Sequence, residues 1–144
     1  MSTEAFFSDE QKSRIRKAIE IAEEKTSGEI RVHVQKKCKG ETVKEAEKVF
    51  GKLKMHKTQQ RNGILFFLAI ESRVFAIYGD KGINEKVPAD FWNGISAFME
   101  NHFRKNEFTD GLIGGITMAG NQLKQHFPHA DDDKNELTNE ISFK

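Results

Sequence analysis

The stretch that decides the fold runs from Arg61 to Gly82 and reads RNGILFFLAIESRVFAIYGDKG. It holds an unbroken apolar run at residues 64–70, a short polar turn, and a second, largely apolar run at residues 74–78. Apolar runs of this length, bounded by glycine and polar residues, are typical of buried β-strands. Because the turn reverses the chain, the sequence predicts a β-hairpin whose first strand begins where its second strand ends.

Two segments before the hairpin complete a βαβ unit. Residues 29–36 alternate between apolar and polar side chains, as in a strand with one face in the core. Residues 42–53 open with a capping-box pattern, Thr42 and Glu45, and then carry apolar residues at helical spacing. The crossover predicts that strand 29–36 lies parallel to strand 64–70, so both strands begin at the same edge of the sheet.

Three further segments show helical periodicity. One covers residues 8–25 after a Ser8 and Gln11 capping box, one starts at Pro88, and one runs from Thr109 to near Pro128. The predicted fold is therefore α/β, with a small mixed β-sheet, made of a βαβ unit and a β-hairpin, packed between about four α-helices.

The composition indicates one globular domain. Of the 144 residues 37% are apolar and 31% are charged, and no apolar run reaches the roughly 18 residues that would span a bilayer. The N-terminus lacks the features of a secretory signal, so we expect a cytoplasmic protein without a membrane partner. Residues 1–128 are expected to form the domain, and the acidic residues 129–144 are expected to form a disordered tail.

Three oxygen-bearing side chains are predicted to meet at the edge where the parallel strands begin. Glu29 opens the first strand, Asn62 precedes the second, and Asp80 follows the hairpin's last strand. Carboxylate and amide oxygens are the ligands that Ca²⁺ prefers. The alternative is that Asn62 and Asp80 hydrogen-bond within their own turns while Glu29 is solvated.

The chain resembles the TPM domain family. The resemblance covers about residues 8–127 and rests on the order and spacing of five motifs: Thr26-Ser27-Gly28-Glu29-Ile30, Asn62-Gly63-Ile64-Leu65, Tyr78-Gly79-Asp80-Lys81-Gly82-Ile83, the segment 103–108, and Gly111. It implies a small mixed sheet packed between helices. Plant members are described as calcium binders and acid phosphatases, so the resemblance implies a divalent cation, calcium in the first place. Many members have Asp or Asn where this chain has Arg61.

Two acids are second candidates as metal ligands. Glu107 and Asp110 flank the predicted start of the last helix, where an acidic side chain can instead satisfy a helix N-terminus. A straight preceding helix would carry both residues to the far edge of the sheet.

Two other functions stay open. A metal-assisted phosphatase would use Arg61 or Lys81 to balance developing charge, but no nucleophile motif is present. An interaction module would use the lysines of residues 36–61, a segment that contains nine Lys or Arg and only three Glu. A protein partner fits such a face better than nucleic acid, because the face lacks interleaved aromatic residues; a merely solvated face is the alternative.

Overall fold

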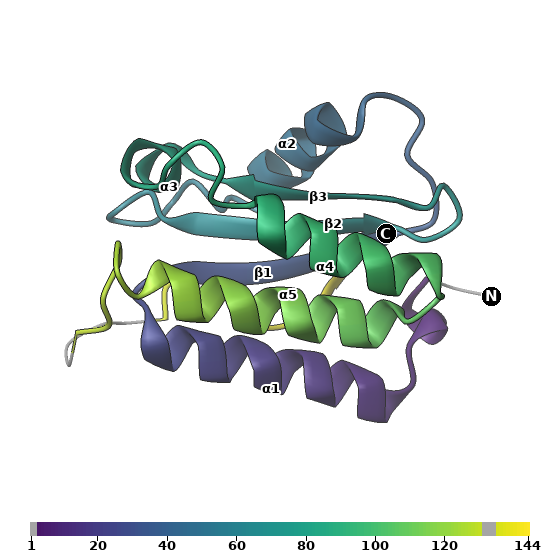
Figure 1. The fold of residues 1–144 in the computed structure, drawn as a ribbon. Coiled ribbons are helices and arrows are strands. Elements are labelled where there is room, and N and C mark those ends of the chain that lie inside the picture. Colours follow the sequence, from purple (N-terminus) through teal and green to yellow (C-terminus); the bar gives the residue numbers. More distant parts are fainter. Residues whose placement is uncertain (1–2, 131–134) are drawn as a thin grey trace.

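The computed structural model describes residues 3–130 and 135–144. Helices and strands alternate along most of the chain (Figure 1). The helices are η1 (Glu4–Phe6), α1 (Asp9–Lys25), α2 (Thr42–Lys52), α3 (Lys81–Lys86), α4 (Asn93–Arg104) and α5 (Phe108–Leu123). The strands are β1 (Glu29–Gln35), β2 (Gly63–Ala69), β3 (Val74–Gly79) and β4 (Ser142–Phe143).

The four strands form one mixed sheet in the order β3-β2-β1-β4. Strands β1 and β2 are parallel, with Glu29 opposite Gly63, and β2 pairs with β3 in an antiparallel hairpin. The βαβ unit and the hairpin are therefore confirmed. We call the edge where β1 and β2 begin the amino edge, and the opposite one the carboxyl edge.

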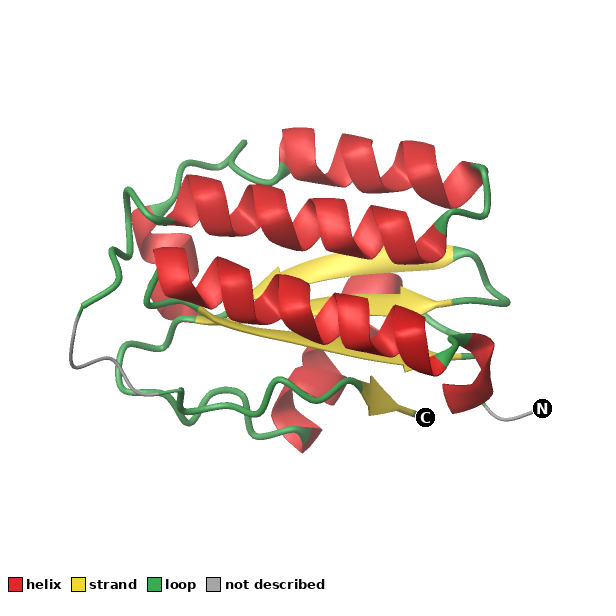
Figure 2. Ribbon diagram, turned by 90° about the horizontal axis from the view of Figure 1, so that it is seen from below, coloured by secondary structure: helices red, strands yellow, loops and turns green. Residues whose placement is uncertain are grey.

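Helices cover both faces of the sheet. Helices α1, α4 and α5 lie side by side on one face, and α2 lies on the other (Figures 1 and 2). Ile30 and Ile64 belong to the core beneath the three helices, whereas Leu65 and Phe67 pack in the smaller core that includes residues of α2. This double covering explains why every residue of β2 is buried. The predicted fold class is confirmed.

The helices differ from the prediction in four places. Helix α5 ends at Leu123, before the predicted end near Pro128. Thr42 does not cap α2, because Glu41 occupies the N-cap position and makes no side-chain capping bond. Helix α4 begins at Asn93, since the backbone from Pro88 to Trp92 forms turns instead. Helix α3 was not predicted at all. Within the described residues, no helix is both long and apolar enough to cross a membrane.

The last ten residues are ordered against the domain, which corrects the prediction of a disordered tail. Strand β4 pairs in parallel with β1, placing Ser142 opposite His33 and Phe143 opposite Val34. Ile141 and Phe143 pack on the main core, so this segment buries more apolar surface than its acidic composition indicated. The acidic run 131–133 lies outside the described residues.

Candidate functional site

The amino edge brings together the three side chains that the sequence placed there. Glu29 is opposite Gly63 in the sheet, and the Asp80 amide donates to the Gly63 carbonyl at 2.9 Å. The Glu29 amide donates to the Asn62 carbonyl at 3.1 Å. Glu29 and Asp80 lie on opposite sides of β2, however, so two strand spacings, roughly 10 Å, separate their backbones.

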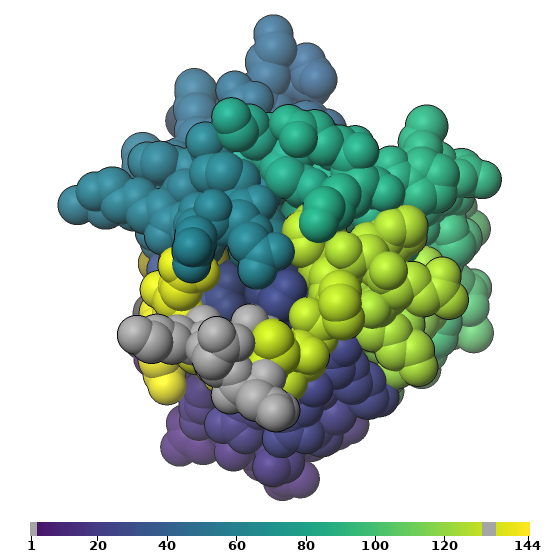
Figure 3. Space-filling model, turned by 90° about the vertical axis from the view of Figure 1, so that its left-hand side faces the viewer, coloured from purple at the N-terminus to yellow at the C-terminus, as the bar shows by residue number. Residues whose placement is uncertain are grey.

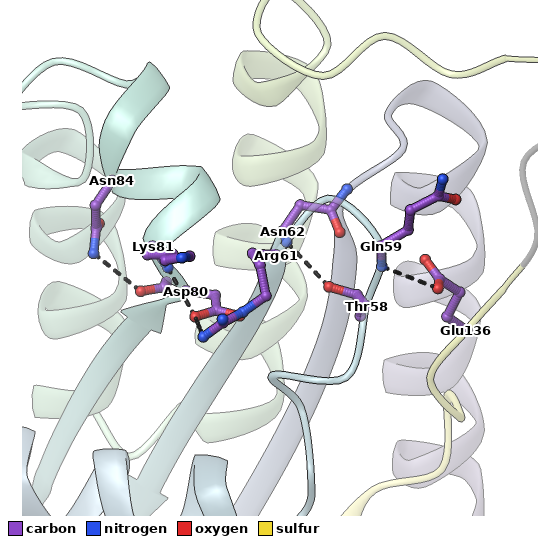
Figure 4. A network of polar contacts seen from close by, with 9 residues as sticks. Thr58, Gln59, Arg61, Asn62, Asp80, Lys81, Asn84 and Glu136 are labelled. Atoms are coloured by element: carbon purple, nitrogen blue, oxygen red, sulfur yellow. Dashed lines mark hydrogen bonds and ion pairs between the residues drawn. The ribbon is translucent and has the colours of Figure 1, made fainter.

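Asp80 forms an ion pair with the side chain of Arg61. The Arg61 guanidinium donates from Nε to Oδ2 at 2.7 Å and from Nη2 to Oδ1 at 2.9 Å (Figure 4). The Lys81 amide also donates to Oδ1, so Asp80 caps α3. The hydrogen bonds to Asp80 raise the pKa of Arg61. Arg61 reaches this position from a left-handed backbone conformation with φ 50°.

Asn62 is buried with one of its polar atoms unsatisfied. Its backbone amide donates to Thr58 Oγ1 at 3.2 Å (Figure 4). Its Nδ2 donates to the Ser27 carbonyl at 2.9 Å, which ties the start of β2 to the loop before β1. Its Oδ1 is buried and has no hydrogen-bond partner among the described residues. An unpaired buried amide oxygen is costly, and it is the kind of atom that an ion or a water satisfies.

Glu29 binds the backbone of the C-terminal segment. The residue is 5% exposed, and Oε1 accepts from the amides of Glu136 at 2.6 Å and Leu137 at 2.9 Å. The prediction of a solvated or metal-bound Glu29 missed these contacts because the segment was expected to be disordered.

A hollow opens beside Glu29 at the amino edge. It encloses about 210 Å³. Figure 3 views the molecule from this end, where the dark blue of the chain around the start of β1 lies recessed between the neighbouring segments. We call it the acidic hollow; it is lined by Glu20, Glu23, Glu24, Thr26, Ser27, Glu29, His129, Asn135 and Asn139. Four glutamate side chains line this space, and no lysine or arginine does among the described residues.

Glu23 is one of several lining residues that the sequence analysis missed. Its Oε2 accepts from the Ile30 amide at 2.9 Å, at the start of β1. Burial raises the pKa of Glu23 to about 8, an effect that the Ile30 hydrogen bond opposes and the charge of Glu29 reinforces. The signal was present in the sequence, because Glu23 lies four residues after the buried Ile19 and hence on the edge of the apolar stripe of α1.

Glu107 and Asp110 lie at the other end of the molecule. The Ser27 amide donates to the Phe127 carbonyl at 2.9 Å, which fixes the chain just beyond the end of α5 near the amino edge. The start of α5 is therefore one helix length, about 24 Å for 16 residues, away. There Glu107 pairs with His102 at 2.9 Å and Asp110 with Arg14 at 3.3 Å. The structure thus separates these two residues from the predicted site.

The five predicted ligands therefore do not form one coordination shell. Across the described chain, no three His, Cys, Asp or Glu side chains are grouped so that they could hold a metal ion by themselves. A cation at the amino edge would need amide, carbonyl or water oxygens in addition to carboxylates.

Comparisons with known proteins agree with the geometry of the fold. The family model of the TPM domain matches residues 1–122, and the chain belongs to the TPM domain family. The NMR structure of the BA42 protein from the psychrophilic bacterium Bizionia argentinensis is 42% identical, with a TM-score of 0.92 and 96% of each chain covered. A search of curated proteins gave no match.

Two more distant solved structures share the fold. The N-terminal domain of a protein from P. gingivalis is 18% identical, with a TM-score of 0.69 over 86% of this chain and 82% of that one. The N-terminal domain of the cg2496 protein from Corynebacterium glutamicum is 12% identical, with a TM-score of 0.65 over 96% of this chain and 80% of that one. At these identities the likeness concerns the fold alone.

Proposed function

We propose that the acidic hollow binds a divalent cation, calcium in the first place. The observation that carries the proposal is the lining: four glutamate side chains, of which Glu23 is largely protonated near pH 7, and two asparagine amides surround a hollow of about 210 Å³ that, among the described residues, receives no lysine or arginine. Such a space attracts a cation and has room for the water molecules that calcium retains. The TPM family, whose plant members are described as calcium binders, supports the choice of ion.

Glu29 is the central ligand in this proposal. Its carboxylate accepts two backbone hydrogen bonds from the C-terminal segment and lines the hollow, so it lies where the ion would bind. Asn135 and Asn139 bring amide oxygens from the same segment. Asn62, whose Oδ1 is unsatisfied, is hydrogen-bonded through Nδ2 to Ser27, which lines the hollow. With few charged ligands fixed in place, the expected affinity is weak, with Kd about 10⁻⁴–10⁻³ M.

Asp80 has a smaller part in this proposal than the sequence indicated. Arg61 already neutralises it through two hydrogen bonds, so a cation would have to displace a tethered guanidinium to reach it. Arg61 stands where many family members carry Asp or Asn, and this replacement moves the proposed ion toward Glu29.

A calcium titration followed by amide NMR spectra tests the proposal. We expect saturable shifts confined to residues 27–30, 62–63 and 135–139, and their loss in Glu29→Gln, which keeps an acceptor for the Glu136 and Leu137 amides. Asp110→Asn is the matched control, since it removes a carboxylate about 24 Å away, and it should titrate like the wild type. The absence of localised shifts at about 10 mM calcium, which is tenfold above the weakest expected Kd of about 1 mM, would reject the site.

A metal-assisted phosphatase remains a prediction without a specific observation in its favour. Of its two proposed charge-balancing residues, Arg61 is bound to Asp80. Hydrolysis of p-nitrophenyl phosphate that depends on both calcium and Glu29 would be the result that favours it.

A further inference from the structure

A second concave surface lies at the carboxyl edge, at the other end of β1. It encloses about 600 Å³, within the size range of small-molecule sites. We call it the lysine groove; its ten lining residues are Gln35, Lys36, Lys37, Lys39, Gly40, Glu41, Lys44, Glu45, Lys48 and Lys144. Six lysines and two glutamates give it a formal charge of +4.

The fold, and not the sequence run alone, makes this groove. Strands β4, β1 and β2 are parallel and end at this edge, which is where ligands bind in open α/β sheets. Lys36 and Lys37 follow β1, Lys44 and Lys48 lie one turn apart on α2, and Lys144 follows β4. Two neighbouring segments and the distant Lys144 therefore supply the positive charge.

The floor of the groove is fixed by hydrogen bonds of the buried Gln35. Gln35 is 3% exposed, and its Nε2 donates to the Lys37 carbonyl at 2.7 Å and to Glu45 Oε2 at 3.2 Å. Its Oε1 is 2.9 Å from Nε2 of His33. These bonds hold the loop after β1 against α2. They also give Glu45, one of the two acids of the groove, a hydrogen-bond partner.

The lysines themselves are largely unneutralised. Lys44 is 3.9 Å from Glu41, and no other lysine of the groove forms an ion pair with a described residue. Glu41 leaves the N-terminus of α2 without a side-chain cap, so backbone amides there add to the positive end of the helix. The lining contains no aromatic residue and no arginine, and hence nothing that would stack on a nucleobase or grip one phosphate in two places.

We infer that the lysine groove binds the oligophosphate group of a small ligand. Several mobile ammonium groups around one concave space suit a compact anion with multiple charges better than a single carboxylate or an extended chain of bases. The acidic hollow lies beyond the full length of β1, roughly 23 Å for seven residues, so a cation bound there would not reach the phosphate. The inferred binding at the groove is therefore independent of the proposed cation site.

Sodium tripolyphosphate is the probe, used with the full chain in calcium-free buffer so that the outcome does not depend on the cation site. We expect 1:1 binding by calorimetry, with amide shifts at residues 35–48 and 144. Lys44→Gln with Lys48→Gln should weaken binding about tenfold. The control, Lys52→Gln with Lys57→Gln, removes the same charge from exposed positions outside the groove and should change affinity less than twofold.

Three results would overturn the inference. The first is the absence of localised shifts at millimolar tripolyphosphate. The second is equal weakening in the two double variants, which would mean diffuse attraction by the whole basic face. The third is tighter binding at the same amides by a single-stranded RNA oligomer or by vesicles of phosphatidylserine, which would make the surface one for a macromolecule or a membrane.

Discussion

The guanidinium of Arg61 and the carboxylate of Asp80 form a two-point ion pair between the residue before β2 and the residue after β3. The pair closes the open end of the hairpin, and the Asp80 side chain is only 6% exposed. The same carboxylate caps α3, so one residue joins the end of the sheet to the start of a helix.

We predict that Asp80→Ala lowers the free energy of unfolding by about 1–2 kcal/mol, because it removes the cap of α3 and the partner of Arg61. Urea denaturation measures the change. Asp90→Ala is the control, since Asp90 is exposed, and it should stay within about 0.5 kcal/mol of the wild type. Equal stability of the two variants would show that the pair does not stabilise the fold.

Loss of the Glu29 carboxylate should release the C-terminal segment. Each hydrogen bond to a charged group contributes about 1.5–3 kcal/mol, and Glu29 accepts two from the backbone of this segment. We expect Glu29→Ala to speed amide hydrogen exchange at residues 136–144 at least tenfold, whereas Glu29→Gln retains an acceptor and should have a smaller effect. Unchanged exchange in Glu29→Ala would contradict this anchoring role.

Glu23 should make stability depend on pH. Its pKa is raised from 4.5 to about 8 in the folded protein, so between these values the folded state binds a proton that the unfolded state has lost. Stability should therefore fall as the pH rises from about 4.5 to about 8, by a few kcal/mol at about 1.4 kcal/mol per pKa unit. The pH series of melting temperatures should be flatter in Glu23→Gln than in the wild type.

The control for this series is Glu24→Gln, which removes an exposed carboxylate one residue away. It should retain the wild-type slope. A Glu23→Gln series that parallels the wild type would assign the pH dependence to other groups.

Gly82 should tolerate no side chain. A Cβ at this position would overlap the carbonyl oxygens of Gln60 and Arg61, and the Gly82 amide already donates to the Arg61 carbonyl at 2.9 Å. Overpacking against fixed backbone predicts a loss of about 1–3 kcal/mol in Gly82→Ala, measured by thermal denaturation.

Gly94 provides the opposite control. It lies in α4 with no atom within 4 Å of an added Cβ, so Gly94→Ala should raise stability by about 0.5–1 kcal/mol through helix propensity alone. A stable Gly82→Ala protein would show that the loop before β2 can move away.

The sheet and its main helices could be predicted because their signals are local. The apolar runs of β2 and β3 and the alternation in β1 fix their type, and the short turn leaves little freedom in pairing. Strand β4 could not be predicted, since Ser142 and Phe143 are too few for a periodic signal and their partner, β1, lies about 109 residues away. Helix α3 was obscured by Gly79 and Gly82, although Asp80 offered a cap signal.

The location of the candidate site could be predicted from the sequence, but the contacts of its side chains could not. Strand order brings Glu29, Asn62 and Asp80 to one edge, and this follows from topology alone. The partner that each side chain binds depends on rotamers and on the path of the C-terminal segment, which sequence periodicity does not contain. The acidic hollow was missed for that reason, since Asn135 and Asn139 of this segment form part of its wall.

The acidic hollow and the lysine groove place clusters of opposite charge at the two ends of β1, although the formal net charge is only +1. In low salt the protein should turn to present opposite ends to surfaces of opposite charge, and so bind both anion and cation exchangers near neutral pH. At physiological ionic strength the Debye length of about 8 Å is shorter than the separation of the two ends. Each end would then act on its surroundings as an independent charge.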